Sequence, residues 1–164
     1  MLDTSFWSGA VHVGVDAYLP LFFERPILVP SAVVEEVERR TVRVSTRIRE
    51  DQQRFRLWLE DGRLAIEDPA SRYPLFGRGE AACLGLALER ANMAVLVNEV
   101  KAYVEAGRIG LRAIAVPEII VRLVREGHIA PVRGLTMLDV LHETTSPLII
   151  RTAKLAIGEA DPEP

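Results

Sequence analysis

The chain has 164 residues, of which 49% are hydrophobic and 26% are charged, and its formal net charge is −3 at pH 7. This length fits one domain, and the composition is that of a globular protein rather than a fibrous or low-complexity chain. The single cysteine, Cys83, excludes an intrachain disulfide and a zinc site built from several thiolates, and the small negative charge argues against general coating of nucleic acid.

The N-terminal half alternates short apolar segments with longer helical patterns. In chain order it predicts a very short strand over residues 1–3, a helix over 12–23, a strand over 26–30, a helix over 32–59 and a strand over 64–66. The long helix is mostly charged, and we expect a break in it near Ser45. Ser31 is expected to cap its N-terminus.

The C-terminal half continues this alternation. In chain order it predicts a helix over 81–89, a strand over 94–97, a helix over 101–106, a strand over 112–116, a helix over 117–126 and a helical segment over 131–157. We predict a single domain over residues 1–157, in which 131–157 is a C-terminal helical extension, and a disordered tail over 158–164. No apolar run approaches the roughly 20 residues needed to span a bilayer, so we expect a cytoplasmic protein with no membrane partner.

Acidic residues stand where the predicted strands end or the next helices begin. Short strands alternating with helices predict a mainly parallel sheet covered on both faces, in which strand C-termini and helix N-termini open along one edge. The acids expected at that edge are Asp3, Glu35, Glu36, Glu80 and Glu99. Taken singly, an acid in the first turn of a helix is explained by the helix dipole. Taken together, converging carboxylates repel one another, and a hard divalent cation such as Mg²⁺ or Mn²⁺ removes that penalty.

Four ordered segments of the chain resemble PIN domains, most closely a prokaryotic branch with a Gly-x-Gly-Glu-Ala loop. The segments are Leu2-Asp3-Thr4-Ser5, Val29-Pro30-Ser31-Ala32-Val33-Val34-Glu35-Glu36-Val37, Gly77-Arg78-Gly79-Glu80-Ala81-Ala82 and Val95-Leu96-Val97-Asn98-Glu99-Val100-Lys101-Ala102. The resemblance implies a three-layer α/β/α sandwich with a central, mainly parallel sheet. It also implies a metal-dependent ribonuclease, and many members of the family are toxins of toxin–antitoxin pairs.

The resemblance assigns roles to individual residues. Asp3 is similar to the first acid of the family, Glu36 to the second and Glu80 to the third, and Ser5 is the accompanying hydroxyl. At the fourth acidic site relatives often carry two aspartates, whereas this chain has Asn98 followed by Glu99. The implied catalytic and metal-binding set is Asp3, Glu36, Glu80 and Glu99, with Ser5 and Asn98 in support.

The resemblance also suggests partners. An RNA substrate, a cognate antitoxin and a second copy of the chain in a homodimer are implied. Four arginines of the long helix are candidate contacts to the RNA backbone: Arg39, Arg40, Arg43 and Arg47. A solvated helix face, with acids interleaved among these arginines, explains them equally well.

Two other functions stay open at this point. A PIN-fold binding or assembly module without nuclease activity is supported by the substitution of Asn98 and Glu99 at the fourth acidic site. A phosphatase that uses Asp3 as its nucleophile is the weaker alternative, because such enzymes usually carry a second aspartate two residues later, where this chain has Ser5.

Overall fold

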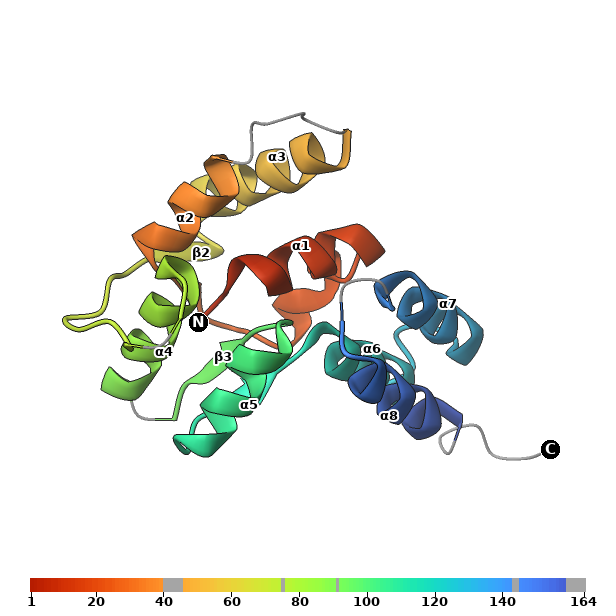
Figure 1. Ribbon diagram of the computed structural model, residues 1–164. Helices are drawn as coiled ribbons and strands as arrows, with labels where there is room; N and C mark the ends of the chain where they lie inside the picture. Colours follow the sequence, from red (N-terminus) through yellow and green to blue (C-terminus); the bar gives the residue numbers. More distant parts are fainter. Residues whose placement is uncertain (40–45, 75, 91, 143–144, 159–164) are drawn as a thin grey trace.

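The computed structural model describes residues 1–39, 46–74, 76–90, 92–142 and 145–158 (Figure 1). Two pairs of short parallel strands form the centre of the protein. β1 (Ile27–Val29) pairs with β2 (Leu64–Ile66), and β3 (Ala94–Leu96) pairs with β4 (Arg112–Ile114). The predicted parallel pairing is therefore confirmed, but it takes the form of two separate two-stranded sheets.

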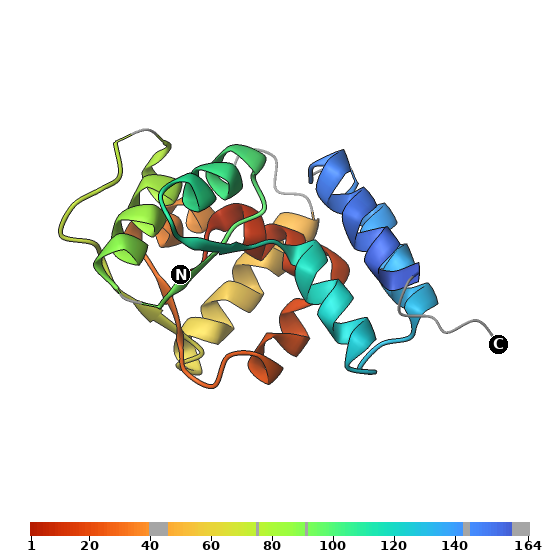
Figure 2. The same cartoon turned by 90° about the horizontal axis from the view of Figure 1, so that it is seen from below.

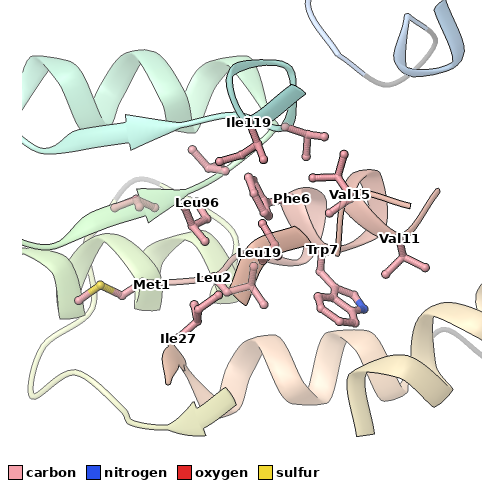
Figure 3. Close-up of a cluster of buried hydrophobic side chains, with 14 of the residues drawn as sticks. Met1, Leu2, Phe6, Trp7, Val11, Val15, Leu19, Ile27, Leu96 and Ile119 are labelled. Atoms are coloured by element: carbon pink, nitrogen blue, oxygen red, sulfur yellow. The ribbon is translucent and has the colours of Figure 1, made fainter. Parts of the chain in front are cut away.

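The first three residues lie between these two sheets. The backbone N–H of Leu2 donates to the carbonyl of Leu28 at 2.9 Å, and that of Asp3 donates to the carbonyl of Leu96 at 3.0 Å. Figure 3 shows Met1 and Leu2 between Ile27 of β1 and Leu96 of β3. In the described part of the chain, residues 1–3 form one isolated parallel bridge, between Leu2 and Leu96. A helix begins directly after them. Residues 1–3 nevertheless tie the two sheets together.

Helices pack on both sides of the strands. α4 (Arg78–Glu89) and α5 (Val100–Arg108) lie on one side, and α3 (Thr46–Glu60) lies on the other (Figure 2). α1 (Thr4–Val13) packs against α3, where the ring of Trp7 meets the rings of Phe55 and Trp58 edge to face at centroid distances of 5.3 Å. Burial of these aromatic side chains is a main source of stability on that side.

The first helix corrects the prediction for residues 12–23. α1 begins at Thr4 because the Asp3 carboxylate caps it, and it ends at Gly14, which has a φ of 74°. Such left-handed backbone is favourable for glycine and stops a helix. Residues Asp16–Leu21 form a short 3₁₀ helix instead.

The long charged helix is two helices. α2 spans Ser31–Glu38 and α3 begins at Thr46, while the expected break falls on residues 40–45, which lie outside the described residues. Pro30, and not Ser31, is the N-cap of α2. The Ser31 hydroxyl and N–H both donate to Asp68, at 2.6 and 2.8 Å, so that serine anchors the loop after β2 rather than capping the helix.

The last three helices pack against one another at one end of the protein (Figure 1). They are α6 (Val116–Arg125), α7 (Pro131–Leu141) and α8 (Pro147–Gly158). Gly158, which we expected in a tail, is the last residue of α8, and residues 159–164 lie outside the described part. The division into one domain with a helical extension stays a prediction. Within the described ranges, every helix is too short or too polar to cross a bilayer.

Candidate active site

Asp3 is the most deeply buried acid of the predicted set. Its side chain is 2% exposed. Its Oδ2 accepts hydrogen bonds from the backbone N–H of Ser5 at 2.9 Å and from the Ser5 hydroxyl. Burial raises the pKa of Asp3, and the neighbouring charge of Glu36 raises it further, while the Ser5 bonds act in the opposite direction. Asp3 therefore sits in an environment that resists its negative charge.

Glu36 connects three segments of the chain. From α2, its Oε2 accepts a hydrogen bond from the Thr4 hydroxyl at 2.9 Å, and its Oε1 accepts one from the Gly79 N–H at 2.8 Å. A Cβ atom at Gly79 would lie 2.9 Å from the Glu36 Cδ and Oε1 atoms, so a larger residue there would require the Glu36 carboxylate to move. The glycine of the predicted loop thus lets the start of α4 approach this carboxylate.

Glu80 and Glu99 interact with each other. Glu80 is half-buried in the first turn of α4, and Glu99 is the exposed N-cap of α5. Burial raises the pKa of Glu80 to about 7, and the charges of Asp3 and Glu99, together with a hydrogen bond to Glu99, contribute to this rise. The first turn of α4 thus holds a carboxyl group whose pKa lies near neutral pH.

Asn98 is buried beside these acids. Its backbone N–H donates to the Ser5 Oγ at 3.0 Å, and its side-chain Nδ2 donates to the Thr145 Oγ1 at 2.6 Å. The side chain is 2% exposed, and its Oδ1 has no hydrogen-bond partner among the described residues. Asn98 is thus a buried amide with one oxygen that has no hydrogen-bond partner in the described part of the chain.

The four predicted acids are linked pairwise through electrostatic interactions. Asp3 interacts with Glu36 and with Glu80, and Glu80 interacts with Glu99. Among the residues that the structure describes, however, no three His, Cys, Asp or Glu side chains are close enough together to hold a metal ion. The donors are all hard carboxylate or amide oxygens that Mg²⁺ and Mn²⁺ favour, and a cation would relieve the repulsion that adds to the effect of burial on the pKa of Glu80. The chemistry of the donor set therefore fits such an ion.

The structure describes two of the four candidate RNA-binding arginines, Arg39 and Arg47. Arg39 forms an ion pair with Glu35 at 3.1 Å, and Arg78 approaches the same carboxylate at 3.4 Å. Arg47 is half-buried at the start of α3. The remaining two candidates, Arg40 and Arg43, lie outside the described residues.

Two residues of the site, Thr4 and Thr145, were not assigned a role from the sequence. Thr4 is next to a predicted acid, so its proximity in the chain was an available signal. Thr145 lies 47 positions after Asn98, in the connection between α7 and α8, and nothing in the sequence indicated their contact.

Carboxylates that interact near strand ends and helix starts are the kind of donors that hold hard divalent cations in metal-dependent phosphodiester hydrolases. A family model described as PIN domain matches residues 16–152. The chain belongs to the PIN domain family, whose members are generally nucleases, as the ordered segments of the sequence predicted. Glu36, Glu80 and Glu99 fall inside the matched range, whereas Asp3 precedes it. No curated protein and no solved structure matches the chain in the corresponding searches.

Proposed function

We propose that the protein is a Mg²⁺- or Mn²⁺-dependent endoribonuclease of the cytoplasm that cleaves single-stranded or loop RNA. The observation that carries this proposal is the interaction of the half-buried Glu80 with both Asp3 and Glu99. Burial first, and these two neighbours second, raise the pKa of Glu80 to about 7. Membership of the PIN family supports it further. RNA is favoured over duplex DNA because unpaired RNA segments present accessible backbone and bases to a protein cleft.

The roles of the residues follow from their contacts. Asp3, Glu80 and Glu99 would hold the ion, since their carboxylates oppose one another. Glu36 is engaged by the Thr4 hydroxyl and the Gly79 N–H, so we assign it to positioning of the strand end and the start of α4. When bound, the divalent ion lowers the pKa of water and neutralises charge on the phosphate that is attacked. Ser5 holds Asp3 in place through the bonds to its Oδ2.

Cleavage of a labelled single-stranded RNA with Mn²⁺ tests the proposal. We expect the wild type to cleave, and we expect Asp3→Asn and Glu80→Gln to lose activity by at least a hundredfold. Glu60→Gln, at the exposed end of α3, is a matched control that should cleave like the wild type. Chelation of the metal with EDTA should stop cleavage by every active form.

A binding module without nuclease activity is the second candidate. It is favoured by the separation of the acids, since no metal-binding group of three forms in the described part of the chain, and by Asn98 at the fourth acidic site. This function predicts no cleavage by the wild type and no Mn²⁺-dependent rise in melting temperature. Either a rise in melting temperature or cleavage would exclude it.

The toxin role, the antitoxin and the homodimer form a separate part of the proposal. Their support is the resemblance of the sequence to toxins of this family and the apolar surface of α8, where Leu148 and Leu155 are 72% and 60% exposed. A gene for a small DNA-binding protein directly upstream, whose product suppresses growth arrest by this chain, would support the toxin role. A monomeric elution profile at micromolar concentration would contradict the homodimer.

A further inference from the structure

The connection between α7 and α8 reaches the acidic site through one side chain. Thr145 is 7% exposed, and its backbone N–H donates to the carbonyl of Leu141 at the end of α7, at 3.0 Å. Its Oγ1 accepts the hydrogen bond from the Nδ2 of Asn98 at 2.6 Å. Thr145, in the connection between the two C-terminal helices, is thus in direct contact with Asn98, the residue before Glu99.

Hydrogen bonds continue from this contact to the buried Asp3. The N–H of Asn98 donates to the Ser5 Oγ at 3.0 Å, and the Ser5 hydroxyl donates to the Asp3 Oδ2. A shift of Asn98 would therefore move the group that positions Asp3, as well as the start of α5 at Glu99. Residues of this kind commonly set the orientation of the groups that bind a metal.

The amide of Asn98 is held on its nitrogen side only. A Cβ at Gly9 would lie 3.3 Å from the Asn98 Nδ2, so α1 packs closely against this nitrogen, and Thr145 accepts its hydrogen bond. The Oδ1 is buried and has no partner among the described residues. A buried oxygen without a donor is unfavourable, and the hydrogen bond with Thr145 is the side-chain interaction that holds this amide in place.

We propose that Thr145 is a positioning residue, which fixes Asn98 so that Asp3 and Glu99 stand in the arrangement that binds the divalent ion. This inference rests on the proposed function. It adds the connection between α7 and α8 to the parts of the chain that position the metal-binding residues. The Thr145 hydroxyl acts through Asn98 and touches neither the ion nor the RNA.

Removal of the hydroxyl tests this role in the full-length protein. Thr145→Val keeps the size of the side chain and removes the acceptor, and we expect its Mn²⁺ dissociation constant, measured by calorimetry, to rise about tenfold. Thr145→Ser restores the acceptor and should lie within about twofold of the wild type. Thr136→Val is the matched control, because the Thr136 hydroxyl donates to a carbonyl of its own helix α7 and should not affect binding.

A second measurement detects the hydrogen bond between Asn98 and Thr145 in the absence of metal. In the apo protein, the side-chain NH₂ protons of Asn98 should exchange with solvent more slowly in the wild type and in Thr145→Ser than in Thr145→Val. Thr145→Ala repeats the comparison if the valine variant does not fold. This readout separates a positioning role from a general loss of stability, since Thr136→Val leaves the exchange unchanged.

Two results would overturn the inference alone. One is wild-type Mn²⁺ affinity in a folded Thr145→Val protein, and the other is weakened binding that Thr145→Ser does not restore, which would assign the effect to packing of the methyl group. A wild type that neither binds Mn²⁺ nor cleaves RNA would instead overturn the proposed function together with this inference.

Discussion

The acidic site has two sides that differ in how the protein stabilises their charges. On one side, the carboxylates of Asp3 and Glu36 accept hydrogen bonds from Ser5, Thr4 and Gly79. On the other side, burial raises the pKa of Glu80 to about 7, and the carboxylates of Asp3 and Glu99 add to this rise. The first side is held by the protein's own donors, whereas the second is stabilised by a proton or a cation. We infer that Glu36, on the first side, builds the site, that Glu80 and Glu99, on the second side, bind the ion, and that Asp3, which interacts with both sides, also contributes to binding.

Gly79→Ala should have the largest effect on stability, because it disrupts the side that builds the site. The added Cβ would overlap the Glu36 carboxylate and displace it from the Thr4 hydroxyl and the Gly79 N–H. We expect a loss of about 1–2 kcal/mol in the free energy of unfolding, measured by urea denaturation, because the end of the Glu36 side chain gives up two hydrogen bonds when it moves aside.

Gly107→Ala is the matched control for that substitution. Gly107 lies in α5, and a Cβ there would meet nothing within 4 Å. Alanine should raise stability at this position by about 0.5–1 kcal/mol, since glycine is a poor helix former. A Gly79→Ala protein as stable as the wild type would show that Glu36 can leave its contacts without penalty.

The raised pKa of Glu80, on the side that binds the ion, should make the stability of the protein depend on pH. The raised pKa of Glu80 means that the folded protein retains this proton where the unfolded chain has lost it. The stabilisation is complete below about pH 4.5 and is lost as the pH rises to about 7. Glu80→Gln should remove this part of the pH dependence in EDTA, making the variant more stable than the wild type at pH 8 by roughly 1 kcal/mol, because solvent screens this half-exposed group.

Added metal should reverse the order of stability of the wild type and Glu80→Gln at pH 8. Added Mn²⁺ should raise the melting temperature of the wild type at pH 8 and leave that of Glu80→Gln almost unchanged, because binding to the folded state stabilises it. An equal rise in both proteins would place the ion away from Glu80 and contradict the assignment of the binding side.

Much of the strand pattern was predictable from the sequence, because short apolar segments between prolines or glycines have few other structures available. Residues 27–29, 64–66 and 94–96 are strands as predicted. The first helix is misplaced in the prediction because Asp3 is expected to end a strand or cap a turn, whereas its carboxylate caps a helix. That cap moves the start of α1 to Thr4.

The acids of the site could be selected from the sequence, but their division into two sides could not. Strand ends and helix starts identify Asp3, Glu36, Glu80 and Glu99 as neighbours along one edge. Whether a carboxylate meets a donor or another carboxylate depends on side-chain direction and on contacts distant in sequence. The approach of Gly79 to Glu36, 43 positions apart, is such a contact.

Glu36→Gln gives the smallest expected effect and separates the two sides most directly. Glutamine keeps an oxygen that accepts from the Gly79 N–H, and its side-chain N–H can donate to the Thr4 Oγ1, so the free energy of unfolding should change by less than about 1 kcal/mol. Mn²⁺ affinity should fall less than in Glu80→Gln. Glu35→Gln, whose native carboxylate pairs with Arg39 and Arg78, is the control on the same helix. If Glu36→Gln instead loses Mn²⁺ as completely as Glu80→Gln, the Glu36 carboxylate binds the ion, as the family resemblance implied, and the boundary between the two sides lies beyond Glu36.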